Sequence, residues 1–238
     1  MDEKISRLRE MIDASHNIVF FGGAGVSTES GIPDFRSVDG LYHQKYKYPP
    51  EEILSGSFFE ERPEEFYEFY RDKLKFNGAK PNPAHLYLAE LERQGRLSAV
   101  VTQNIDGLHQ DAGSKKVLEL HGTLKRFYCT HCGLEMSVEA VNACSRAPRC
   151  SCGGIVRPDV VLYEECLNSA VLSEAMTRIS QCDMLIIGGT SLVVYPASGL
   201  VNYYKGDRLV LINKMSTPYD GRANLVINEP IGKVFSQL

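Results

Sequence analysis

Tryptophan, an excess of basic residues and long apolar runs are all missing from this chain of 238 residues. Its 26 Lys and Arg residues are outnumbered by 30 Asp and Glu residues, and the formal net charge of −4 argues against a protein that holds nucleic acid through overall basic charge. No apolar run approaches the roughly 18 residues that a membrane-spanning helix needs. The first residues also lack the basic and then apolar pattern of a signal peptide. We therefore expect a soluble, cytoplasmic protein with no membrane contact and no direct nucleic-acid binding.

The seven cysteines agree with a reducing compartment. An odd number would leave one thiol unpaired, and close cysteine pairs in a protein without a signal peptide are more typical of metal ligands than of disulfides. The rest of the composition is that of an ordinary globular protein, with 43% hydrophobic and 24% charged residues. The length suffices for one large core, with or without a smaller appended module.

Short apolar runs alternate with amphipathic stretches toward both ends of the chain. The runs have the length of buried strands and lie at 18–21, 99–101, 184–187, 209–212 and 225–227. Helical patterns cover residues 2–15, 83–95, 167–181 and 196–204. This alternation predicts an α/β fold with a doubly wound, Rossmann-like parallel sheet and helices on both faces.

Two insertions interrupt the alternation. Residues 37–80 are rich in Tyr, Phe, Pro and Glu and contain a helix expected to start at Pro63, and residues 122–157 hold most of the cysteines. Both insertions leave the sheet and return to it, so we expect them to build one smaller zinc-binding and helical lobe. The nucleotide-binding domain would then consist of residues 1–36, 81–121 and 158–238.

A glycine-rich segment, Gly22–Thr28, follows the first predicted strand. Glycines let the backbone approach a phosphate, and a helix that starts there supplies unpaired N–H donors. The dinucleotide fingerprint is incomplete, because Thr28 stands where the third glycine would be. The alternative interpretation is a tight strand–helix turn with no ligand.

Four cysteines are spaced as a metal site: Cys129, Cys132, Cys150 and Cys152. The second pair is tighter than the usual two-residue spacing, and Cys144 is a rival ligand that breaks the paired pattern. Four thiolates fill the tetrahedral coordination of Zn²⁺ and leave no position for water, so the predicted site is structural. The alternative is a set of buried, reduced cysteines.

Polar residues follow several other predicted strands. Gln103–Asp106, His121, Gly188–Ser191 and Asn213 each stand at or just after a strand end. Because ligands bind outside the carboxyl ends of the strands of an open parallel sheet, these residues favour one nucleotide site. His121 is placed to act as a general base there, although a lone histidine is more often structural. Asp106 alone could equally be a helix cap.

Together these segments resemble the sirtuin family of NAD-dependent protein deacylases, of the bacterial type. The resemblance covers almost the whole chain: Gly23–Arg36, Thr102–His109, Leu120–Gly122, the cysteine quartet, Arg157–Val161, Gly188–Leu192 and Leu211–Asn213. The first segment and Gln103–Asp106 are the most specific. Little sequence flanks them, so we expect a minimal enzyme without targeting extensions.

The resemblance implies a role for each segment. NAD, the co-substrate, would be contacted by Gly23, Ala24, Gly25, Thr28, Asp34, Phe35, Arg36, Gln103, Asn104, Ile105, Asp106, His121, Gly189, Thr190, Ser191, Asn213 and Ile231. His121 would be the general base, with Asn104 and Asp106 also catalytic. The peptide would be clamped as an added strand by the segment Val160–Glu164, which includes Val161, Leu162 and Tyr163, and by the stretch near Val193. Tyr67 and Tyr70 would lie near the acyl group. The zinc would be structural.

The implied reaction removes acetyl, or another neutral acyl group, from lysine in proteins or peptides and releases nicotinamide and O-acetyl-ADP-ribose. Sirtuins that favour acidic acyl groups carry a Tyr-x-x-Arg pair. Here Tyr70 stands where that arginine would be, and Arg71 lies one residue further on, about 100° around a helix. Two alternatives are protein ADP-ribosyl transfer from NAD in the same cleft and a non-enzymatic, zinc-stabilised binding module.

Overall fold

The larger part of the protein is built on a six-stranded sheet. The computed structural model describes residues 2–34, 40, 46–76 and 78–238, so Phe35 and Arg36 lie outside the described residues. Across the sheet the strands follow the order β3 (Val117–Glu119), β2 (Leu97–Thr102), β1 (Ile18–Gly22), β7 (Met184–Gly188), β8 (Leu209–Ile212) and β9 (Leu225–Ile227). Every neighbouring pair is parallel. The predicted fold class is confirmed.

Helices cover both faces of this sheet. On one face lie α1 (Asp2–Asp13), α5 (Pro83–Arg93) and α9 (Ile231–Phe235), and on the other lie α8 (Ser169–Gln181) and the 3₁₀-helix η5 (Ala197–Tyr203). Successive residues of β1 alternate between the two cores, because side chains along a strand point to opposite faces: Phe20 packs in the first and Phe21 in the second. Both phenylalanines are fully buried, as expected for a continuous apolar strand.

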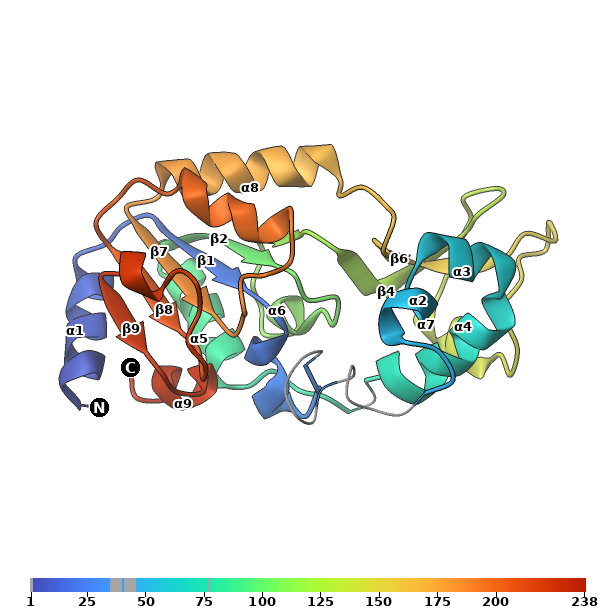
Figure 1. The fold of residues 1–238 in the computed structure, drawn as a ribbon, viewed down its shortest axis with the longest axis horizontal. Coiled ribbons are helices and arrows are strands. Elements are labelled where there is room, and N and C mark those ends of the chain that lie inside the picture. Colours follow the sequence, from blue (N-terminus) through green and yellow to red (C-terminus); the bar gives the residue numbers. More distant parts are fainter. Residues whose placement is uncertain (1, 35–39, 41–45, 77) are drawn as a thin grey trace.

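The small lobe combines the two insertions (Figure 1). The first contributes α2 (Pro50–Ile53), α3 (Gly56–Glu61), α4 (Pro63–Phe69) and a π-helical turn, η4 (Tyr70–Leu74). The second contributes α7 (Val138–Ala143) and an antiparallel sheet of β5 (Glu135–Met136), β4 (Gly122–Cys129) and β6 (Val156–Val160). Side chains from both insertions, among them Phe66 and Phe127, share one hydrophobic cluster. Among the described residues, neither insertion has a hydrophobic cluster of its own.

The direction of winding changes at β1, which lies between β2 and β7. Connections therefore diverge at the carboxyl ends of these strands and leave a crevice, the usual ligand position in such sheets. The segments that leave these ends include the 3₁₀ turns η1 (Ala24–Val26) and η2 (Thr28–Ser30) after β1, and α6 (Leu108–Asp111) after β2. A further 3₁₀ turn, η6 (Asp220–Arg222), precedes β9. Across the described residues, no helix has the length and apolar character needed to cross a bilayer.

Candidate active site and metal centre

A cavity of about 390 Å³ lies at the crevice and continues toward the small lobe. Seventeen of the residues predicted to bind NAD or peptide line it: Gly23, Ala24, Gly25, Asp34, Gln103, Asn104, Ile105, Asp106, His121, Val160, Val161, Leu162, Tyr163, Gly189, Thr190, Ser191 and Asn213. These residues come from segments far apart in the sequence. The sheet topology brings them together, as expected from the strand ends.

The loop after β1 packs directly on the loop after β7. The Gly25 N–H donates to the Gly189 carbonyl at 2.8 Å, and a Cβ added to Gly25 would lie 2.8 Å from the Gly189 Cα. A side chain at Gly25 would therefore push the two loops apart. The expectation of a helix after this loop was wrong, because two 3₁₀ turns follow instead. Gly31, with φ of 82°, and Pro33 end the helical geometry before a full α-turn develops.

Asp106 is held by a polar network at the base of the cavity. Its two oxygens accept from the Ser27 hydroxyl at 2.7 Å and from the Leu108 N–H at 2.9 Å. The Asn104 amide donates to the same hydroxyl at 3.1 Å. The N-cap of α6 is Gly107, so Asp106 is not the helix cap of its alternative interpretation. It instead accepts from the first N–H of the helix from one position earlier, and its carboxyl group lies on the cavity wall. Asn104 is only 8% exposed, so its orientation is set by these contacts.

His121 stands between β3 and β4, with its ring on the cavity wall. Its Nδ1 lies 2.9 Å from the Gln103 carbonyl oxygen. Because a carbonyl only accepts, Nδ1 must carry the proton, and the neutral ring then presents an unprotonated Nε2. Burial lowers the pKa of His121, and the bond to the carbonyl acts in the opposite direction. The ring is therefore neutral at pH 7 and able to accept a proton.

Ser27, Glu29 and Asn82 support the site but were missed as individual residues in the sequence. The Glu29 carboxylate accepts from the Gly232 and Lys233 N–H groups at 2.6 and 3.0 Å and ties the β1 loop to α9. The Asn82 amide donates to the Val26 carbonyl at 2.7 Å. Ser27 and Glu29 lie within the segment Gly23–Arg36 that carries the family resemblance. Their hydrogen-bond partners are far away in the sequence, so the sequence gives no signal for these contacts. Asn82 before Pro83 signals only a helix start.

Three predicted NAD or peptide residues do not line the cavity. Ile231 is 2% exposed and packs in the core beneath Gly188. The Thr28 hydroxyl donates to the Gly25 carbonyl at 3.0 Å and so braces the loop from within. Val193 is 48% exposed, next to Val194, which does line the cavity. Their direct contacts to NAD or peptide stay predictions.

Tyr67 and Tyr70 point into the small-lobe core. The Tyr67 hydroxyl donates to the Val156 carbonyl at 2.7 Å, and the Tyr70 hydroxyl donates to Asn142 Oδ1 at 3.1 Å. Burial raises the pKa of both phenols, that of Tyr70 to about 12. The apolar part of the cavity is lined by other residues: Leu54, Phe66, Leu74, Phe76, Ile105 and Leu124. The structure thus does not bring the two tyrosines to the cavity.

No lysine or arginine lines the cavity among the residues that the structure describes. Arg71 instead donates to the Arg146 carbonyl at 3.4 Å, on the outside of the small lobe. It lies in the π-helical turn rather than in a regular α-helix, so its predicted rotation rested on the wrong helix type. As expected, Arg71 faces away from the cavity, so it brings no positive charge to the acyl group.

The four predicted metal ligands form a second cluster at the far end of the small lobe. The sulfur atoms of Cys129, Cys132, Cys150 and Cys152 all lie within 4.8 Å of one another. Backbone N–H groups, first that of Cys132, donate to the Cys129 sulfur and lower its pKa. A Cβ on Gly154 would lie 2.6 Å from the Cys129 sulfur, so the turn behind the second pair requires glycine.

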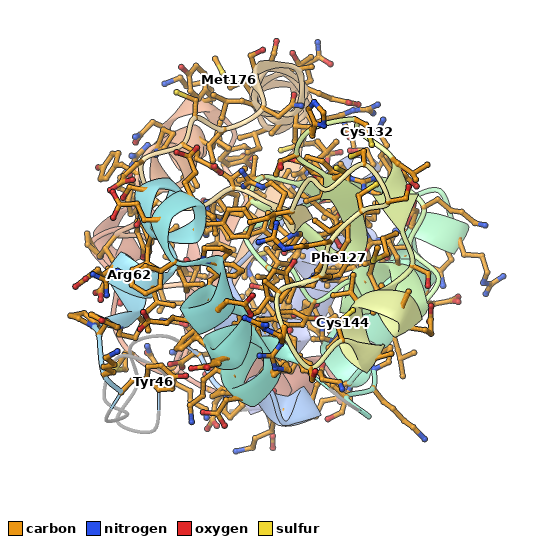
Figure 2. All side chains as sticks on the ribbon, turned by 90° about the vertical axis from the view of Figure 1, so that its right-hand side faces the viewer. Tyr46, Arg62, Phe127, Cys132, Cys144 and Met176 are labelled. Atoms are coloured by element: carbon orange, nitrogen blue, oxygen red, sulfur yellow. The ribbon has the colours of Figure 1, made fainter. Side chains whose placement is uncertain are left out.

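Cys144 is not part of this cluster. Its thiol points to the Ala140 carbonyl at 3.4 Å, at the end of α7. Figure 2, which looks onto the small lobe, shows Cys144 well apart from Cys132. The predicted quartet fits a tetrahedral thiolate site: it has four soft ligands whose sulfur atoms lie within 4.8 Å of one another, and backbone N–H donors lower the pKa of Cys129 and Cys150.

The comparisons with known proteins all point to one protein family. The model of the Sir2 family matches residues 23–196. A curated NAD-dependent protein deacetylase of Clostridium perfringens is 58% identical over 242 aligned positions, covering 100% of this chain and 99% of the relative.

Solved structures of Sir2 proteins have the same fold. One, with a p53 peptide and NAD⁺, is 39% identical, covers 98% of this chain and 96% of its own, and superposes with a TM-score of 0.87. Another holds a deacetylated p53 peptide and 3′-O-acetyl-ADP-ribose, with 39% identity, coverage of 98% and 96%, and a TM-score of 0.89.

Proposed function

Because the chain belongs to the Sir2 family, we propose that it is an NAD-dependent protein-lysine deacetylase that releases nicotinamide and O-acetyl-ADP-ribose. The observation that carries the proposal is the meeting of His121, Asn104 and Asp106 in one cavity that also has an apolar section. The polar section suits a nucleotide, and the apolar section suits an aliphatic side chain that carries a neutral acyl group.

His121 is the proposed general base. NAD supplies the electrophilic ribose carbon and the nicotinamide leaving group. The unprotonated Nε2 of His121 would take a proton from a ribose hydroxyl and so increase its nucleophilicity toward the transferred acyl carbon. The bond between Nδ1 and the Gln103 carbonyl at 2.9 Å holds the ring in the tautomer that this task needs.

Asn104 and Asp106 are proposed to hold the nicotinamide end of NAD. An amide and a carboxylate match the donors and acceptor of a carboxamide. Their positions are fixed before any ligand binds, because Ser27 joins them through hydrogen bonds of 2.7 and 3.1 Å. A site that is already ordered avoids the entropy loss of ordering its side chains on binding. Gly189, Ser191 and Asn213 also line the cavity and are proposed to contact the adenosine half.

The peptide is proposed to lie between two walls of the cavity. One wall is the extended segment 160–163, and the other is the segment around Val194 and Tyr195. An extended peptide between them would pair through its backbone, which explains how one enzyme can accept many sequences around the modified lysine. Phe35 and Arg36 are included in the proposed NAD site on the sequence resemblance alone.

Zinc is proposed as a structural ion at the cysteine quartet. Four thiolates leave no open coordination position, so the ion would supply folding energy to the small lobe rather than chemistry to the cavity. We propose residues 1–36, 81–121 and 158–238 as the NAD-binding domain, and residues 37–80 and 122–157 as the small lobe. Strand β6 (Val156–Val160) crosses this boundary, since it pairs with β4 in the small-lobe sheet. We also propose a cytoplasmic location, since thiolate ligands persist most readily in a reducing compartment.

Mass spectrometry of an acetyl-lysine peptide incubated with the zinc-loaded protein tests the proposal. NAD-dependent loss of the acetyl group supports it. An unchanged peptide, with a folded protein and NAD present, would contradict it. ADP-ribose found covalently on a protein instead would favour ADP-ribosyl transfer as the main activity.

A further inference from the structure

Glu164 has a backbone conformation that its residue type disfavours. Its φ is 74°, in the left-handed region, where L residues other than glycine are uncommon and strained. Glycine would adopt this conformation without the strain. The residue directly follows the segment 160–163 and itself lines the cavity. A strained residue at such a place suggests that its side chain serves the site.

The Glu164 side chain links the cavity wall to the first insertion. One carboxylate oxygen accepts from the Ser57 N–H at 3.0 Å, and the other accepts from the Ser57 hydroxyl at 3.1 Å. Ser57 lies in the first turn of α3. Both oxygens are therefore used on one residue of the small lobe, 107 positions away in the sequence.

The backbone of the neighbouring residue makes a parallel link. The Tyr163 N–H donates to the Leu54 carbonyl at 2.9 Å, and the Gly56 N–H donates to the Tyr163 carbonyl at 3.0 Å. These bonds make an isolated bridge between Tyr163 and Ser55. An isolated bridge is a weak attachment compared with a continuous ladder, and the Glu164 carboxylate extends it by one residue on the same two segments.

Glu165, the next residue, has a different task. Its carboxylate accepts from the Arg157 guanidinium at 2.8 and 3.0 Å and from the Leu162 N–H at 2.8 Å. All of these partners lie within eight positions, so Glu165 closes its own turn. Of these two carboxylates, that of Glu164 is the one with hydrogen bonds to the first insertion, and this difference separates its role from general stabilisation of the turn.

From these contacts we infer that Glu164 is a positioning residue for the peptide: its carboxylate fixes the wall 160–164 against the start of α3, in the orientation that an extended peptide would pair with. The inference rests on the proposed function, because it takes this wall as the peptide side of the cavity. Hydrogen bonds at an exposed position add little to global stability. Loss of the link is therefore expected to change peptide binding more than folding.

Three substitutions separate this role from its alternatives. Glu164→Gly removes the link and also relieves the backbone strain. Glu164→Gln keeps an oxygen for the Ser57 N–H and an amide donor for the Ser57 hydroxyl, but removes the negative charge. Glu61→Ala is the matched control, because it removes another carboxylate from α3 while leaving the Ser57 link intact.

The measurements are KM for an acetyl-lysine peptide, KM for NAD, kcat and the midpoint of thermal unfolding. For Glu164→Gly we expect the peptide KM to rise roughly three- to tenfold, with the KM for NAD unchanged and the unfolding midpoint unchanged or higher. Glu164→Gln and Glu61→Ala should stay close to wild type. A purely structural role would instead lower the unfolding midpoint of Glu164→Gly, and an electrostatic role would make Glu164→Gln as defective as Glu164→Gly. Either result, or an unchanged peptide KM in Glu164→Gly, overturns the inference.

Binding of a fluorescent acetyl-lysine peptide without NAD separates this inference from the proposed function. If the wild-type protein binds the peptide but does not deacetylate it, the proposed function fails. Comparing peptide binding by the variants still tests the role of Glu164. Weaker binding by Glu164→Gly then supports the inference, and equal binding contradicts it. If wild type deacetylates and all variants bind equally, only the inference fails. A wild type that binds no peptide contradicts both.

Discussion

At the scale of single residues, His121 combines a half-buried ring with one strong directional contact. Burial lowers its pKa, and the Gln103 carbonyl determines which nitrogen carries the proton. The sequence predicted the residue and its task from its place at a strand end. It could not predict the tautomer, because the carbonyl partner lies 18 positions away and depends on how β2 and β3 pair.

Replacing His121 by Ala should separate binding from turnover. The variant keeps the rest of the cavity wall, so we expect NAD affinity to stay within a few-fold of wild type. Loss of a general base commonly lowers the rate by roughly 10²- to 10⁴-fold. Calorimetric titration with NAD and a steady-state deacetylation assay measure the two effects. Turnover close to wild type would remove His121 from the mechanism.

Two further histidines make stability depend on pH. His85 and His109 are buried with their ring centroids 4.7 Å apart. Burial lowers the pKa of His85 to about 4 and that of His109 to about 3. The unfolded chain takes up these protons near pH 6.5, whereas the folded protein does not until the pH is much lower. Their stabilising contribution is therefore complete above pH 6.5 and decreases as the pH falls through the window from 6.5 toward 4.

Urea unfolding between pH 7 and pH 5 measures this dependence. Each histidine adds about 1.4 kcal/mol of lost stability per pH unit within the window. His109→Phe, beside Phe20, should flatten the slope, whereas the exposed His16→Gln serves as the control for loss of a histidine. Equal slopes for His109→Phe and wild type would show that His109 takes up its proton equally in the folded and unfolded states.

At the scale of elements, patterns with a strong period were predictable and special turns were not. The strands β1, β2, β7, β8 and β9 and the helices α1, α5 and α8 follow directly from apolar patterns, whereas the small-lobe strands β4, β5 and β6 were not predicted. The 3₁₀ turns after β1 and the π-helical turn η4 do not, because Gly31, Pro33 and tertiary packing override the local pattern. The burial of Tyr67 and Tyr70 was also missed, because it depends on how α4 and η4 pack against the second insertion rather than on the local sequence pattern.

The cysteine module gives a prediction at this scale. Cys152→Ser removes one of the four clustered sulfurs, so we expect loss of bound zinc and a destabilised small lobe. A loss of about 4 kcal/mol would lower the unfolding midpoint by roughly 8–16 °C in a protein of this size. Cys144→Ser is the matched control and should keep one zinc per chain. Metal analysis and thermal unfolding decide the matter, and equal zinc content in the two variants would contradict the assigned quartet.

At the scale of the whole molecule, the cavity is lined from both lobes: Gly189 lies on the large sheet side, while Phe66 and Leu124 belong to the two insertions. Sheet order and strand-end chemistry predicted the polar side of this cavity, which is the proposed NAD site. The apolar side depends on how two insertions pack together, which no local pattern reports. The link between Glu164 and Ser57 is of the same kind.

The composition of the cavity predicts the acyl preference. Since no described lysine or arginine lines it, an acidic acyl group would lose hydration without gaining an opposite charge. We expect kcat/KM for a succinyl-lysine peptide to be lower than for the matched acetyl-lysine peptide by roughly 10²-fold or more. Competition between the two peptides in one reaction gives the ratio directly. Comparable efficiencies would place a cation at the acyl end of the site.

The most direct test follows the acetyl group itself. A peptide whose acetyl-lysine carries an isotopic label in the acetyl group is incubated with NAD and the zinc-loaded enzyme, and the products are separated by mass. We expect the label to leave the peptide and to appear in O-acetyl-ADP-ribose, in an amount equal to that of the free-lysine peptide and of nicotinamide. Label found only as free acetate from the start of the reaction, or retained on the peptide while ADP-ribose becomes protein-bound, would contradict it.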